Sequence, residues 1–182
     1  FHSCVYIMKI KNILIGLCIC FFLSGCMMMP HASGKEKVIV VYASSGYLQY
    51  YLRPAKMICT DKDDKAFVLI DFTYQKDGRS YVTDSYVNFT LNCKTDAFIS
   101  SARFVLTDSA VAELKNLSML KRSKKEGLIR VTTTLEKERI EEVLQALYDS
   151  KALLEITLDD GSVKRFTVTR DLIDRIDDAF SK

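Results

Sequence analysis

The stretch AFVLIDFTYQKDGRSYVTDSYVNFTL, residues 66–91, decides the fold class of this chain. Its first nine residues contain the run FVLI, which is apolar on both faces, as in the central strand of a sheet. Asp77-Gly78 is a dipeptide typical of tight turns. After the turn, Val87, Phe89 and Leu91 alternate with polar residues and so share one face of a second strand. The stretch therefore predicts an antiparallel hairpin.

Outward from this hairpin, the chain alternates between further strand patterns and helix patterns. The strand candidates are residues 37–43, 47–52, 97–106, 117–120, 128–135, 152–158 and 162–169. We expect Pro54 to end the strand at 47–52, because proline has no N–H to donate to a ladder. The pattern predicts one α+β domain over residues 37–182, with a mainly antiparallel sheet and two or three helices.

Three segments have helical patterns. Residues 108–115 form a short helix candidate with Thr107 as its cap. The spacing of Thr133 and Glu136 fits a capping box and predicts a helix up to residue 149, whose apolar stripe is Ile140, Val143, Leu144 and Leu147. Thr169 is expected to cap the last helix, in which Leu172, Ile173, Ile176, Ala179 and Phe180 share one apolar face. We expect this C-terminal helix to pack on the sheet.

The first 25 residues have the organisation of a secretory signal peptide. Met8 is the first methionine and the expected true start, and Lys9 and Lys11 follow it. The apolar run from residue 13 to residue 23 is shorter than the roughly 20 residues that a transmembrane helix needs. We therefore expect residues 1–25 to direct export and to be removed.

The end of that run, Leu23-Ser24-Gly25-Cys26, resembles the lipobox of bacterial lipoproteins. The resemblance covers about the first 26 residues. It implies cleavage before Cys26, attachment of a diacylglyceryl group to its sulfur and acylation of the new amine, such as by palmitate. Residues 26–36 would then be a lipidated tether. Residue 27 is Met rather than the Asp that favours inner-membrane retention in enteric-type sorting, so the outer membrane is favoured over the inner one.

Composition argues against nucleic acid as a partner. Removal of residues 1–25 takes away two lysines and no acidic residue, which leaves 24 basic and 23 acidic residues. A nearly neutral domain lacks the basic excess of a nucleic-acid-binding protein. The expected partners are the membrane, through the lipid on Cys26, and an envelope protein or other envelope component.

Two cysteines remain after Cys26 takes the lipid. Cys59 and Cys93 would face an oxidising compartment, where disulfides form. Pairs across the hairpin at residues 66–91 have numbers that sum to about 155, and these two sum to 152, so the register also favours a disulfide. The alternative is a pair of buried reduced thiols.

Two clusters are candidates for a binding patch. Tyr47, Tyr50 and Tyr51 fit a recognition surface, although half-buried strands also favour tyrosine. The second cluster is the basic run Lys121, Arg122, Lys124 and Lys125. It fits a contact with anionic lipid or a solvated hairpin tip.

Little in the sequence indicates catalysis. After processing, His31 is the only histidine and Cys59 and Cys93 are the only thiols, too few for a Cys/His metal site, and no metal or other cofactor is expected. Asp71 and Asp84 lie within apolar strands and are the candidates for a carboxylate pair. The leading hypothesis is a non-catalytic envelope lipoprotein with a binding domain. A carboxylate-based hydrolase or glycan-active enzyme and a membrane-proximal assembly factor are the alternatives.

Overall fold

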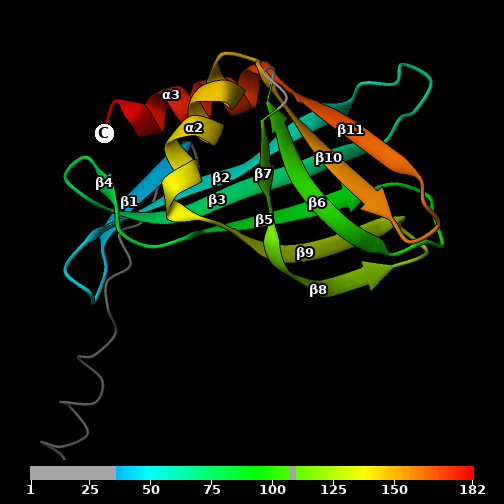
Figure 1. Ribbon diagram of the computed structural model, residues 1–182, viewed down its shortest axis with the longest axis horizontal. Helices are drawn as coiled ribbons and strands as arrows, with labels where there is room; N and C mark the ends of the chain where they lie inside the picture. The colour runs from blue at the N-terminus through cyan, green and yellow to red at the C-terminus, as the bar shows by residue number, and fades with distance from the viewer. Residues whose placement is uncertain (1–35, 107–109) are drawn as a thin grey trace, which may run out of the picture. The chain divides into compact units, whose positions relative to one another are not determined.

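Eleven antiparallel strands and two helices make up residues 36–106 and 110–182, the part of the chain that the computed structural model describes (Figure 1). The strands are β1 (Val38–Tyr42), β2 (Leu48–Cys59), β3 (Phe67–Asp77), β4 (Ser80–Tyr81), β5 (Ser85–Asn92), β6 (Ile99–Leu106), β7 (Val111–Glu113), β8 (Lys115–Ser123), β9 (Leu128–Leu135), β10 (Ala152–Leu158) and β11 (Val163–Val168). The helices are α2 (Lys137–Tyr148) and α3 (Arg170–Phe180). The predicted signal peptide, Cys26, the tether up to residue 35 and the Thr107 cap lie outside the described residues.

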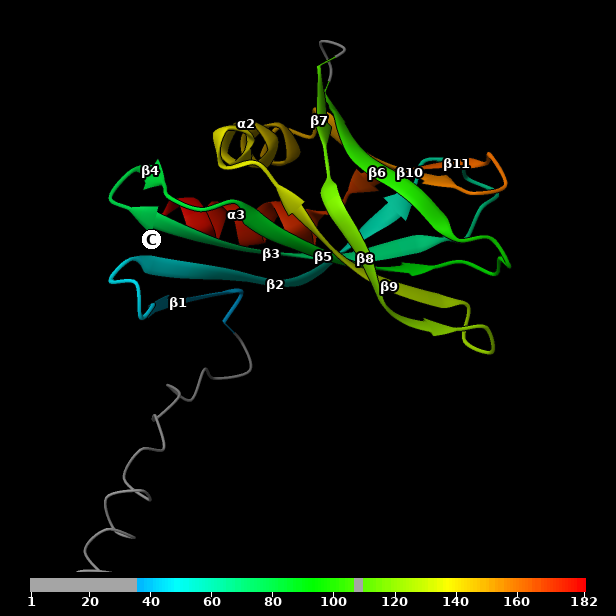
Figure 2. The ribbon, with the colours of Figure 1, turned by 60° about the horizontal axis from the view of Figure 1, so that its bottom comes forward.

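The strands form a single sheet in the order β7-β6-β10-β11-β2-β3-β5-β9-β8, with β1 beside β2 and β4 beside β3. β7 pairs with β6 and β8 pairs with β9, so one nearly continuous run of chain touches both ends of the sheet. The run turns at Asn116, whose φ of 54° is a left-handed conformation that asparagine tolerates. The sheet is consequently a nearly closed barrel (Figure 2).

Only one face of the sheet is buried. Along β3, Val68, Ile70, Phe72 and Tyr74 are fully or almost fully buried, while Leu69 between them is 39% exposed. The buried strand residues share one core with the buried faces of α2 and α3, so both helices lie on this concave face (Figure 1). The opposite, convex face carries no helix within the described residues, and most of its side chains meet solvent, with Glu155 as an exception.

The predicted antiparallel sheet with a C-terminal helix packed on it is confirmed. The α+β class is corrected to mainly β, because strands make up most of the domain and close into a near-barrel. The alternation in residues 66–91 predicts β3 and β5 correctly. Residues 82–84 interrupt the second strand, so that β4 and β5 are separate.

The helix predicted at residues 108–115 is wrong in its described part. Val111–Glu113 is strand β7, and Val111, Ala112 and Glu113 pair with β6. In so short a segment, the apolar residues fit the period of a helix and the period of a strand equally well. The neighbouring edge of β6 decides between them, because it offers backbone hydrogen-bond partners that the local sequence does not reveal.

The expected end of a strand at Pro54 is also wrong. β2 continues through Pro54 to Cys59, and its register with β3 shifts between Leu52 and Ala55. The irregularity sets the proline where the ladder is already interrupted, so its missing N–H costs no regular hydrogen bond. The result is a strand of 12 residues, the longest within the described part of the chain.

The predicted capping side chains serve other partners. Thr133 lies within β9, and its hydroxyl donates to the carbonyl of Lys115. Thr169 does occupy the N-cap position of α3, but its hydroxyl donates to the carbonyl of Lys56 in β2. Both hydroxyls therefore tie neighbouring segments of backbone together.

Candidate functional site

The three tyrosines of the predicted patch do not form one surface. Tyr50 is buried on the concave face and stacks on Tyr74, with ring centroids 5.3 Å apart. Tyr51, the next residue along β2, necessarily points to the convex face and is 37% exposed. Tyr47 precedes the strand. Tyr50 is thus a packing residue, whereas Tyr47 and Tyr51 are each 37% exposed.

The predicted basic cluster is also divided by the structure. Arg122 lies over the ring of Phe98 at 4.1 Å from its centroid and donates to the carbonyl of Asp96 at 2.6 Å. Lys124 pairs with the carboxylate of Asp96 at 3.0 Å. Lys121 points to the convex face opposite Arg130, and Lys125 is exposed in the turn.

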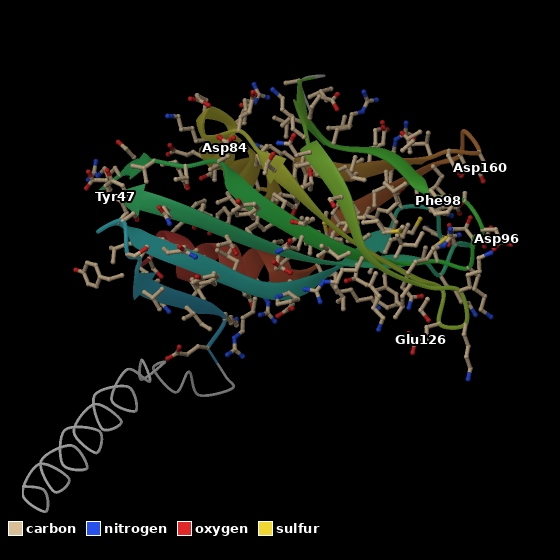
Figure 3. The ribbon with its side chains drawn as sticks, turned by 90° about the horizontal axis from the view of Figure 1, so that it is seen from below. Tyr47, Asp84, Asp96, Phe98, Glu126 and Asp160 are labelled. Atoms are coloured by element: carbon tan, nitrogen blue, oxygen red, sulfur yellow. The ribbon has the colours of Figure 1, made fainter. Side chains whose placement is uncertain are left out.

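The tyrosine and basic clusters lie at opposite ends of the sheet. Leu48, beside Tyr47, pairs with Lys76 at one end of β3. Phe67, at the other end of β3, is in line across the sheet with Leu128 of β9, which pairs with Ser123 in the basic run. At about 3.3 Å per residue these two ends of β3 are roughly 30 Å apart. Figure 3 shows Tyr47 and Glu126 at the two ends. The two predicted clusters therefore cannot form a single patch.

Cys59 and Cys93 are free thiols in the structure. Cys59 belongs to β2 rather than to the hairpin, and its N–H donates to the carbonyl of Ala66. Pairs across the hairpin, such as Phe67 with Asn92, have numbers that sum to 159 rather than to the expected 155, and β3 lies between β2 and β5. The expected hairpin register is therefore wrong. Burial raises the pKa of the Cys93 thiol, and the positive charge of Lys164 only partly opposes that rise. The raised pKa keeps the thiol protonated. The disulfide itself stays a prediction without support from the register.

The two carboxylates singled out in the sequence do not converge. Asp71 is on the convex face and accepts a hydrogen bond of 2.7 Å from the side-chain amide of Asn88. Burial raises the pKa of Asp71, and the Asn88 bond and the charge of Arg130 work against that rise. Asp84 accepts the backbone N–H of Lys137 at 3.0 Å. It therefore caps the first turn of α2 from the segment just before β5, and not from within a strand as the sequence predicts (Figure 3).

We expect Asp84→Ala to lower the free energy of unfolding by about 1 kcal/mol, because one N–H of the first turn of α2 loses its acceptor. Asp84→Asn should keep most of that stability, since its amide oxygen can accept the same bond. Chemical denaturation of both variants measures the difference. Equal stability of Asp84→Ala and the parent chain would contradict the capping role.

One half of the convex face carries charges that are matched to one another. Glu155 of β10 is only 4% exposed and lies between Arg103 of β6 and Arg165 of β11. Its oxygens lie 2.6 Å from Arg103 Nη2 and 2.7 Å from Arg165 Nε. Glu113 of β7 extends the row at 3.8 Å from Arg103. We call these four alternating charges the charge ladder.

The other half of the convex face combines exposed apolar side chains with cations that lack such partners. We define the convex patch as Lys56, Ile58, Phe67, Leu69, Lys121 and Arg130. Lys56, Leu69, Thr90, Arg130 and Lys121 form one row across β2, β3, β5, β9 and β8. Ile58 and Phe67 pair with each other in the next row, and Ile58 and Leu69 are 44% and 39% exposed.

The cations of the convex patch form no salt bridge with any residue in the described ranges. Lys56 Nζ lies 4.4 Å from the centroid of the Phe67 ring, a contact that leaves its charge unneutralised. Asp71 interacts electrostatically with Arg130, and Asp61 lines the same hollow as Lys56, but neither is within salt-bridge distance of a patch cation. The contrast with the charge ladder indicates that this half of the face, unlike the other, holds positive charge available to an external anion.

A shallow hollow of about 300 Å³ adjoins the patch at the end of β2. Its lining residues are Lys56, Ile58, Cys59, Asp61, Lys62, Asp64, Lys65, Ala66 and Phe67. Asp64 is already bound to Lys164, and the bond lowers the pKa of Asp64. The described residues contain no group of three or more His, Cys, Asp or Glu side chains placed to hold a metal ion.

Sequence reasoning missed the convex patch because its members come from four separate segments. The one signal in the sequence is the run FVLI at residues 67–70, whose apolar side chains predict a strand that is buried on both faces. In the structure Phe67 and Leu69 point outward, and Leu69 remains exposed. An apolar outward position next to Lys56 and Arg130 becomes visible only when the register is known.

Comparison of the chain with protein-family models, curated proteins and solved structures finds no match. Among the described residues, neither helix has the length and apolar character needed to cross a membrane.

Proposed function

We propose that this protein is a lipid-anchored, non-catalytic binding domain of the bacterial cell envelope. The lipobox at Leu23–Cys26 supports the anchor, and Met27 favours the outer membrane. The observation that carries the binding role is the convex patch, where Ile58 and Leu69 are exposed among cations with no salt-bridge partner in the described part of the chain.

The neighbouring half of the same face supports this interpretation by contrast. There Glu155 is buried by two arginines, so the chain neutralises its own charges. At the convex patch, no acidic side chain of the described residues forms a salt bridge with the cations, and the aliphatic side chains beside them remain exposed. An external surface that is anionic and partly apolar would satisfy both.

The carboxylate alternative has lost the geometry that motivated it. Asp84 serves a helix N-terminus, and Asp71 is bonded to an amide on the outside of the sheet. Neither faces the other across a cavity, as a glycosidase pair would. The binding role is therefore the function that the structure supports best.

The anchor is tested by fatty-acid labelling of whole cells. We expect Cys26→Ala to incorporate no label, because the acyl chain has lost its attachment atom. Cys20→Ala, a matched change within the leader, should be labelled as strongly as the parent chain. Labelling of Cys26→Ala at the parent level would refute the lipid anchor.

A further inference from the structure

The convex patch lies beside the point at which the chain enters the domain. The N–H of Arg53 donates to the carbonyl of Lys37 at 3.1 Å, so residue 37 is held next to β2. Lys56 is three residues farther along the same strand, roughly 10 Å away. The ten residues from 27 to 36 connect this point to Cys26. Ten residues can span at most roughly 35 Å even when fully extended, so Cys26 lies within that reach of residue 37.

The apolar centre of the patch lies within the sheet, and only Lys121 lies on an end strand, β8. β2, β3 and β5 each have strands on both sides along the patch, and β9 lies between β5 and β8. A peptide therefore has no free edge to extend at Ile58, Phe67 or Leu69. The surface is convex, and a shallow hollow adjoins it beside Lys56.

These features fit a bilayer better than a peptide. Apolar side chains protrude at the centre of the patch, and cations flank them on β2 and on β8 and β9. Long cationic side chains can reach lipid phosphates while aliphatic neighbours enter the interface. We propose that the convex patch rests on a bilayer surface that contains anionic phospholipid, and that the lipid on Cys26 holds it there.

This inference rests on the proposed lipid anchor, but it adds an orientation. The side of the domain that bears Leu69 faces the lipid, and the charge ladder extends toward the opposite edge of the sheet. Each basic residue near an anionic surface strengthens binding roughly fivefold. The contact should therefore weaken when salt screens these charges.

The absence of tryptophan from the sequence allows a direct test. Leu69→Trp places the only tryptophan of the chain in the convex patch. Val111→Trp is the matched control, since Val111 lies on β7 at the far edge of the convex face and is 37% exposed, against 39% for Leu69. The lipidated full chain of each variant is bound to vesicles with brominated acyl chains, which quench tryptophan on contact.

With phosphatidylglycerol in the vesicles, we expect quenching and a blue shift for Leu69→Trp and neither for Val111→Trp. The quenching of Leu69→Trp should fall on vesicles of pure phosphatidylcholine. It should also fall on phosphatidylglycerol vesicles when Lys56→Glu and Arg130→Glu are added to the variant. Far-ultraviolet circular dichroism checks that each variant is folded.

The outcomes separate the two proposals. A chain that floats with the vesicles while Leu69→Trp stays unquenched overturns the bilayer contact and leaves the anchor intact. A lipid-labelled chain that fails to float overturns both. Equal quenching on neutral vesicles overturns the need for anionic lipid.

In intact cells, a photoreactive side chain at position 69 should cross-link to phospholipid. A cross-link to a protein would overturn the proposed bilayer contact in favour of an acidic protein partner.

Discussion

Phe104→Ala is expected to lower the free energy of unfolding by about 3–5 kcal/mol. Phe104 of β6 is fully buried, and its ring stacks on that of Phe72 of β3 with centroids 6.1 Å apart. β6 and β3 are not neighbours in the sheet, so this contact crosses the concave interior. Truncation would leave a cavity between elements that are already fixed by their own hydrogen bonds.

Thermal or chemical denaturation measures this loss, and Phe98→Ala is the matched control. Phe98 is 47% exposed, so removal of its ring should cost less than about 1 kcal/mol even though Arg122 lies over it. Losses of similar size in the two variants would show that the two sides of the barrel do not depend on the Phe72–Phe104 contact.

Glu155→Gln is expected to cost about 2–3 kcal/mol. Removal of one member of a buried ion pair typically costs more, but Arg103 and Arg165 are roughly half exposed and can be hydrated in the variant. Glu113→Gln is the control within the same row. Its carboxylate is 56% exposed and 3.8 Å from Arg103, so its loss should be below about 0.5 kcal/mol.

The effect of Glu155 should depend on pH. Burial alone would raise the pKa of Glu155, but the hydrogen bonds and charges of Arg103 and Arg165 outweigh it and leave the pKa below the ordinary glutamate range. The stabilisation is therefore complete above the ordinary glutamate pKa and is lost as the pH falls through the lowered value. Denaturation curves of the parent and Glu155→Gln should converge in acid, and a difference independent of pH would refute the ladder's electrostatic role.

Local patterns predicted what local interactions determine. The alternation in residues 66–91 located β3 and β5, and the apolar stripe of residues 140–147 located α2, because each element buries one face of its own sequence. Residues 111–113 could not be assigned in the same way. Three residues hold too little periodicity, and their strand exists because β6 lies beside them.

The candidate site depended entirely on register. Leu69 lies between Lys56 and Thr90, and Thr90 beside Arg130, only because three strand pairs align at those residues. The same holds for Glu155, whose two arginines are 52 and 10 residues away in the sequence. Composition gave a balanced charge for the whole domain and could not reveal that matched and unmatched charges occupy different halves of one face.

The attachment of β1 has a mechanical consequence. A pulling force that enters at residue 37 acts first on the Lys37–Asp174 ion pair and on the bond from Lys182 to the Val38 carbonyl. It then reaches the open end of the β1–β2 hairpin, where Val38 pairs with Leu52. Bonds loaded there break one pair at a time rather than all together. β1 would peel away and lengthen the tether, while β2 stayed held in the sheet by β3 and β11.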